Sequence, residues 1–231
     1  KAQAMPLIEV AKPAVLLPLQ LHFQQIFIGS GLILSFMCLA WARALHSYSM
    51  AILALFFAVK SLAILAAGGI SLQALFTDNL DLLNTESVLL STLSNLILFA
   101  FIIKLFALKR TANSYYHLLL RVAFVMVVTV PLSYLVGQTE ISLLTLLLTS
   151  ISLIALVYVI SKVPENRMSS MFLLILVVQL SFNFIVYLLY YLRFSVHVIN
   201  GLDMLAFWVM AIMVTYLMGR KYYCHIGDEK L

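Results

Sequence analysis

Five of the polar side chains inside the long apolar stretches of this sequence are the best candidates for chemistry. Lys60 is the ionisable group closest to the middle of such a stretch. An ammonium inside a bilayer costs about 2.5 kcal/mol or more, so it is a functional candidate by default. Asn95 offers an amide on the next stretch, while Gln179, Asn183 and Tyr187 recur every four residues on one helix face. Together these residues predict a polar site for a ligand or signal.

A structural interpretation of the same residues stays open. A lysine can extend its apolar stem toward the membrane surface or bond a backbone carbonyl. Amide side chains also tie membrane helices together by hydrogen bonding. The sequence therefore leaves two hypotheses for this group, a signal-sensitive pocket and a set of interhelical ties.

A second polar group brackets the entry to the last apolar stretch. It consists of Arg193, His197, Asn200 and Asp203. A histidine at a membrane surface can sense pH, and an Arg–Asp pair can dock an extracellular domain or ligand. The alternative is the ordinary polarity of an interfacial loop.

Catalysis inside the apolar stretches is not supported by the residue types present. All five histidines fall at the ends of these stretches or between them. A haem held between helices, or a buried Ser–His pair, needs an imidazole at depth. There is no His-Glu-x-x-His segment, no pair of carboxylates within the stretches, and no lysine in the last one for a retinal Schiff base. We therefore expect no catalytic residues, no metal, no cofactor and no enzymatic activity in this segment.

The elements that position the polar residues follow from composition. Of the 231 residues, 64% are hydrophobic and only 10% are charged, and the mean hydropathy is +1.09, which is typical of membrane proteins. A helix needs about 20 apolar residues to cross a bilayer core of about 30 Å. Runs of that length occur at 23–41, 49–68, 87–107, 118–136, 141–161, 170–192 and 200–219. They lack the alternation of barrel strands, so we predict an all-α, seven-helix transmembrane bundle with the lipid bilayer as its main partner.

The distribution of basic residues predicts the orientation of the bundle. Counting alternate loops, ten basic residues fall on one side of the membrane, namely Arg43, Lys104, Lys109, Arg110, Arg121, Lys162, Arg167, Arg220, Lys221 and Lys230. The other side has three, namely Lys1, Lys12 and Arg193, together with six acidic residues. The positive-inside rule then places the N-terminus outside and the C-terminus in the cytoplasm. The net charge of +5 thus follows from topology and requires no nucleic-acid partner.

Three segments follow from this topology. Residues 1–22 are an extracytoplasmic lead-in, 23–219 the transmembrane domain and 220–231 a cytoplasmic juxtamembrane linker. Because the chain does not begin with Met, we expect that it is a fragment or processed form, so a larger domain could precede it.

Small residues predict where the first two spans approach closely. Gly31 and Ser35 lie on the first span, and Ala54, Ala58 and Ser61 recur at three- and four-residue spacing on the second. Such stripes let helix backbones approach, either within one chain or between two copies.

The order of these features resembles a known family over about residues 23–220. A glycine-containing first span (FIGSGLILSF) is followed by Tyr48 at the start of the second span and by Gly68-Gly69 before LQALF. The third span ends in FIIKLFALKRTANSYYHLLLR, a Phe-rich helix end, a basic turn and a Leu-Arg restart. These segments are similar to those of the bacterial seven-transmembrane receptors with diverse intracellular signalling modules.

The resemblance implies a sensor in the bacterial cytoplasmic (inner) membrane. Such receptors pass a signal from an extracytoplasmic sensory domain, or from the membrane, to a cytoplasmic output domain such as a histidine kinase or diguanylate cyclase, commonly as homodimers. Both of those domains lie outside this segment. Two alternatives remain, a small-solute permease or channel lined by the polar residues of the spans, and a structural subunit of a larger membrane complex.

Overall fold

The described part of the chain is entirely helical. The computed structural model describes residues 26, 29–67, 80–132, 138–163, 167–192 and 196–228. No strand is present within these ranges. Helices are the expected form for long apolar runs, because a helix satisfies its backbone hydrogen bonds internally without help from water.

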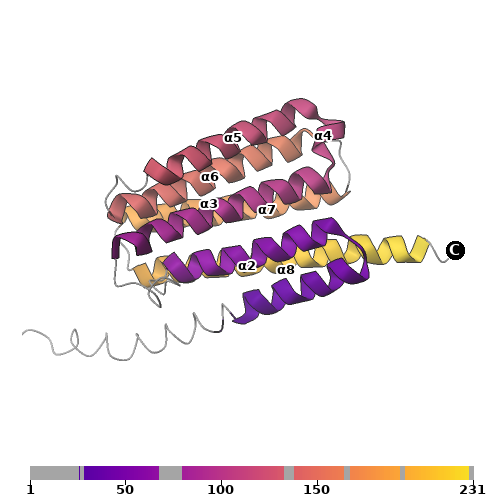
Figure 1. The fold of residues 1–231 in the computed structure, drawn as a ribbon, viewed down its shortest axis with the longest axis horizontal. Coiled ribbons are helices and arrows are strands. Elements are labelled where there is room, and N and C mark those ends of the chain that lie inside the picture. Colours follow the sequence, from indigo (N-terminus) through magenta and orange to yellow (C-terminus); the bar gives the residue numbers. More distant parts are fainter. Residues whose placement is uncertain are drawn as a thin grey trace, which may run out of the picture.

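A first helical segment, Gly29–Ala44, precedes the labelled helices in Figure 1. The helices that follow are α2 (Tyr48–Ala67), α3 (Leu80–Leu105), α4 (Leu108–Thr111), α5 (Asn113–Leu132), α6 (Gln138–Ser161), α7 (Arg167–Tyr191) and α8 (Val196–Asp228). Each of the seven predicted spans overlaps one of the longer helices.

Four stretches of these helices are long and apolar enough to cross a membrane. They are Val88–Leu105, Asn113–Pro131, Leu143–Ser161 and Met168–Tyr191. The shorter apolar stretches are Gly29–Ala44, Tyr48–Ile64 and Met204–Gly219. By length and composition, these are the helices of an integral membrane protein.

The distribution of side chains between surface and interior points the same way. Phe36 and Phe124 are each 70% exposed, whereas Lys60 is only 9% exposed and Asn95 5%. A soluble protein would not expose such large apolar side chains over so much of its surface. Lipid solvates them without cost, and the polar groups are then best placed inside the bundle.

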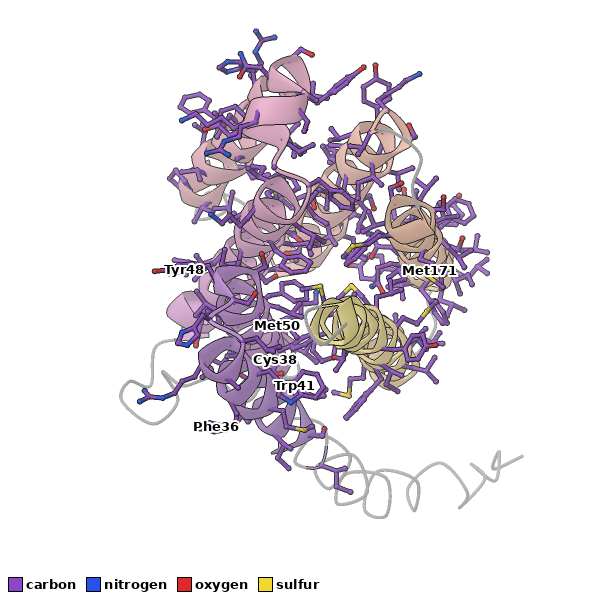
Figure 2. The ribbon with its side chains drawn as sticks, turned by 90° about the vertical axis from the view of Figure 1, so that its right-hand side faces the viewer. Phe36, Cys38, Trp41, Tyr48, Met50 and Met171 are labelled. Carbon is purple, nitrogen blue, oxygen red and sulfur yellow. The ribbon has the colours of Figure 1, made fainter. Side chains whose placement is uncertain are left out.

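Five helices form a closed ring around the bundle interior. α2 packs against α3, α3 against α6, α6 against α7, α7 against α8, and α8 returns to α2. α5 lies outside the ring against α3 and α6. The first helical segment lies outside it against α2 and α8, and Figure 2 shows Trp41 and Met50 close to α8 while Phe36 points away from the bundle. The ring places polar side chains from different helices in one interior.

The chain reverses between α3 and α5 through a short basic turn. Ala107 has a φ of 50°, which ends α3 and starts the single turn of α4. The Thr111 hydroxyl bonds the carbonyls of Phe106 and Ala107, each at 3.3 Å. Because this turn is so compact, α5 begins at Asn113, five residues before the start of the predicted span.

α8 is the longest helix of the described chain, with 33 residues. At 1.5 Å per residue it is about 50 Å long, which exceeds the bilayer core of about 30 Å. Figure 1 shows its C-terminal part extending beyond the other helices. The predicted span at 200–219 covers its apolar part, and the helix continues without a break through the polar residues that follow.

Candidate functional site

Two buried amides converge on neighbouring residues of α6. Nδ2 of Asn95 on α3 donates to Oγ1 of Thr149 at 3.4 Å. Nδ2 of Asn183 on α7 donates to Oγ of Ser150 at 2.7 Å and to the carbonyl of Leu146 at 3.4 Å. Three ring helices are therefore joined through two consecutive hydroxyl groups.

The two hydroxyls can accept these bonds because each uses its own proton elsewhere. Thr149 donates to the carbonyl of Thr145 at 2.9 Å, and Ser150 donates to the carbonyl of Leu146 at 2.8 Å. A hydroxyl carries one donor and two acceptor lone pairs, so an amide can still bond to it. Interhelical bonds of this kind contribute about 0.6 to 2 kcal/mol each in membranes. The amides thus act as interhelical ties in this structure.

Lys60 is buried on α2, on the part of the helix that lies near α8. It lies three residues after Phe57, whose ring packs edge-on against Phe207 of α8 at a centroid distance of 6.0 Å, so the two side chains share a face. The side chain is 9% exposed, and its ammonium is not among the fully buried, unpaired polar atoms of the described residues. A cation placed this deep in a membrane is costly unless polar groups solvate it, so this position can recruit an anion or a polar ligand.

The height of Lys60 follows from the antiparallel pairing of α2 and α3 seen in Figure 1. Nζ of Lys104 lies 5.9 Å from the ring centroid of Tyr48, so these two residues lie at the same level along the bundle axis. Lys60 lies twelve residues after Tyr48 on α2, and Thr92 lies twelve residues before Lys104 on the antiparallel α3. Lys60 and Thr92 therefore also lie at about the same level. Thr92 is buried and lies one turn from Asn95. Lys60 and the amide ties therefore occupy nearly the same layer of the bundle.

Gln179 and Ser152 add polar groups to this layer. Gln179 is 7% exposed and lies one turn from Asn183 on α7. The Ser152 hydroxyl is fully buried, and no described residue is placed to hydrogen-bond with it. Tyr187 is 44% exposed, so it lies at the surface rather than in the buried layer. We name Lys60, Asn95, Ser152, Gln179 and Asn183 the polar layer.

Aromatic rings close the ring interior on one side of the polar layer. Phe172 of α7 packs against Phe101 of α3 at 6.0 Å and edge-on against Phe106, in the turn after α3, at 5.9 Å. All three are buried, and they lie toward the end of the bundle that carries Lys104. These aromatic contacts therefore hold α7 against α3 and the turn after it on this side.

The residues predicted to mediate helix packing lie where the first helical segment meets α2. A Cβ added to Gly31 would overlap the Ser61 hydroxyl and lie 3.0 Å from the Ser61 Cβ. The hydroxyl of Ser35 donates to the carbonyl of Ala54 at 2.8 Å. Ala58, on the same helix, is partly buried. The contact is within one chain, and its closeness depends on the missing side chain of Gly31.

The second predicted group, near the start of the last span, cannot be placed. Arg193 lies outside the described residues, as do the side chains of His197, Asn200 and Asp203. Within the described ranges, no three His, Cys, Asp or Glu side chains are grouped to hold a metal ion.

The hydroxyl groups that accept from Asn95 and Asn183 were not among the residues predicted from the sequence. Thr149, Ser150 and Ser152 form a short polar run (TSIS) in the middle of an otherwise apolar span, and Ser91, Thr92 and Ser94 form another (STLSN) beside Asn95. Clusters of small hydroxyl residues in apolar surroundings were the available signal. Their pairing needed the helix arrangement.

Comparison of the chain with family models, with curated proteins and with solved structures found no match. The function must therefore be argued from the geometry.

Proposed function

We propose that this chain is the membrane domain of a receptor. In this proposal seven helices span the bilayer with the N-terminus outside and the C-terminus in the cytoplasm. The polar layer responds to a signal from outside or from the membrane, and α8 carries the response to an output module of the histidine kinase or diguanylate cyclase type. The observation that carries the proposal is the unbroken course of α8.

The length of α8 supports a relay. Its apolar stretch, Met204–Gly219, continues as one helix to Asp228, nine residues further. Nine helical residues extend about 13 Å. A rigid helix that leaves the membrane can transmit a rotation or a piston movement, whereas a flexible connection would lose it.

Contacts between α8 and the first helical segment support joint movement. A Cβ at Gly31 would lie 4.0 Å from the Phe207 ring, and one at Gly219 would lie 4.0 Å from the Trp41 ring. The residues meet in the same order along both helices, so the two helices run parallel. A shift of one helix along its axis would therefore press directly on the other.

The packing of the interior favours a relay over a transport path. The amides of Asn95 and Asn183 donate hydrogen bonds to hydroxyl groups on α6. Phe101, Phe106 and Phe172 pack together toward the end of the bundle that carries Lys104. Packed helices with two alternative arrangements can switch as a unit, because their cores do not deform continuously. Lys60 and Gln179, which are buried and take no part in the amide ties to α6, are the groups available to a signal.

The test is a fusion of the chain, through Asp228, to a dimeric histidine kinase reporter that begins with a continuous helix. One to four alanines are inserted at the junction. We expect autophosphorylation to vary with a period of about 3.6 residues, because each alanine rotates the reporter by about 100°. A series with Gly-Ser insertions of equal length should lose this periodicity.

A matched pair of variants tests the contact between the helices in the same reporter. Trp41→Ala removes the contact with α8 and should shift the basal kinase activity several-fold. Phe36→Ala changes an exposed aromatic on the same segment and should leave it unchanged. Kinase activity that changes neither with the number of inserted alanines nor on Trp41→Ala would contradict the relay.

A small-solute permease is the second candidate, and the largely buried Lys60 side chain favours it. Proteoliposomes that contain the chain would be assayed for uptake of chloride, inorganic phosphate and acetate. Uptake above that of empty liposomes, abolished by Lys60→Met and preserved by Lys60→Arg, would replace the receptor proposal.

A further inference from the structure

A pocket of about 510 Å³ lies where the first helical segment turns into α2, at the end of α2 that precedes Lys60 by about three turns. Its polar wall consists of Arg43, His46, Ser47 and Tyr48, and its apolar wall includes Leu39 and Ala51. None of the described residues that line it carries a carboxylate. Figure 2 views the bundle from this end, with Tyr48 at its edge.

The backbone holds the polar wall in place through a compact turn. His46 has a φ of 48°, the left-handed conformation that commonly ends a helix. The N–H of Ser47 donates to the carbonyl of Ala42 at 2.9 Å, which closes the turn. Arg43 and His46 are three residues apart at the helix end, so both side chains reach the same side of the turn.

Three sources of positive potential lie in the wall of this pocket or beside it, with Lys104 next to the wall residue Tyr48. Arg43 is an exposed, permanently charged guanidinium. Ser47 and Tyr48 of the pocket wall lie at the N-terminus of the 20-residue α2, the positive end of the dipole of that helix. Nζ of Lys104 lies 5.9 Å from the Tyr48 ring on the neighbouring helix. This combination is suited to a phosphate group.

The surroundings of the pocket are apolar and exposed. Leu39 in its wall is 47% exposed, Phe36 one turn earlier is 70% exposed, and Leu55 one turn after Ala51 is 54% exposed. These side chains follow the two helices away from the charged end, into the part of the surface that lipid covers. A ligand with a phosphate head and an acyl chain would contact both regions.

We propose that this pocket binds the phosphate headgroup of an anionic phospholipid from the leaflet at the basic end of the bundle. Arg43 makes a forked contact with the phosphate, and the α2 N-terminus and Lys104 add charge. An acyl chain lies along Phe36, Leu39 and Leu55. The site differs from the polar layer and does not depend on the receptor proposal.

The test compares lipids that differ only in headgroup charge. The full chain is purified in dodecyl maltoside, titrated with phosphatidylglycerol or phosphatidylcholine of identical acyl chains, and analysed by native mass spectrometry. We expect preferential retention of one phosphatidylglycerol. Arg43→Gln should weaken this retention about fivefold, the effect of about one charge near a lipid phosphate. Arg110→Gln, an exposed arginine on α4 outside the pocket, is the matched control and should retain the lipid normally.

A second variant changes the shape of the pocket without changing its charge. Ala51→Leu fills part of the cavity and should also reduce phosphatidylglycerol retention. Retention that is equal for both lipids, or that survives both Arg43→Gln and Ala51→Leu, would overturn the proposal. Displacement of the lipid by millimolar inorganic phosphate would show that the pocket takes free phosphate, which would overturn the lipid assignment.

Discussion

Individual hydroxyl groups on α6 connect helices that are distant in the sequence. Thr149 and Ser150 each donate a hydrogen bond to their own helix and accept one from an amide on another helix. Each amide is thereby paired inside an apolar bundle, where an unpaired one would carry a desolvation cost. Lys60 is also buried but takes no part in these ties.

The tie made by Asn183 predicts a measurable stability difference. Asn183→Ala removes its bonds to Ser150 and Leu146 and should lower the free energy of unfolding by about 1 to 2 kcal/mol. Ser181→Ala, on the same helix, removes a hydroxyl that is exposed and bonds only the carbonyl of Val177, so it should change stability by less than about 0.5 kcal/mol. Unfolding by SDS in mixed micelles, followed by circular dichroism, measures both. Equal losses for the two variants would rule out a specific tie.

At the scale of elements, the first helical segment packs closely against α2 at a glycine. This is the tightest glycine contact among the described residues. Gly31 lies directly against Ser61, whereas Gly29, two residues earlier, has no atom within 4 Å of an added Cβ. The pair of glycines therefore offers a natural comparison between a packed position and an open one. Close packing of this kind supplies helix association where the hydrophobic effect cannot.

We expect the two glycines to respond differently to the same substitution. Gly31→Leu should force the helices apart and lower stability by about 1 to 3 kcal/mol, the usual cost of overpacking. Gly29→Leu should be neutral or slightly stabilising, because leucine favours the helix. Thermal unfolding in detergent measures both.

A compensating change tests whether the clash itself is responsible. Gly31→Ala should destabilise the protein, and adding Ser61→Gly should restore most of the loss by returning the missing space to the other helix. A double variant no more stable than Gly31→Ala would show that the helix contact is not limited by this pair.

Taken as a whole, the molecule presents apolar side chains outward and polar ones inward. Ile154, in the middle of α6, is 55% exposed, and Tyr191, at the end of α7, is 76% exposed. Lys109, in the turn at the opposite end of the bundle, is exposed as well. Surface exposure in the isolated chain therefore describes two environments, lipid and water, which labelling can separate.

Thiol labelling distinguishes these environments and tests the proposed orientation. In a Cys38→Ala/Cys224→Ser background, single variants Tyr191→Cys, Lys109→Cys and Ile154→Cys are treated with a membrane-impermeant maleimide in spheroplasts. We expect Tyr191→Cys to react at once and Lys109→Cys only after permeabilisation. Ile154→Cys should resist labelling in both conditions, because lipid covers it. Rapid labelling of Ile154→Cys would mean that α6 faces water, and immediate labelling of Lys109→Cys would reverse the orientation.

The sequence by itself determined the class of the molecule and the positions of its helices. Apolar length is a local property, so each predicted span overlaps a helix, and only the ends moved where polar residues continue the helix beyond the apolar run, as at Asn113 and after Gly219. The buried Lys60 and the amides at positions 95, 179 and 183 were also predictable, because polar residues inside apolar runs are visible in composition.

Only the tertiary structure decided which of those polar residues are satisfied. The pairing of Asn95 with Thr149 and of Asn183 with Ser150 depends on α6 lying between α3 and α7, and local patterns do not specify helix neighbours. The basic pocket beside Tyr48 likewise requires a left-handed residue at His46 and the meeting of two helix ends. Hydrogen bonds and pockets form between residues that are far apart in the chain but only a few ångströms apart in space, so they exist only once the helices have packed.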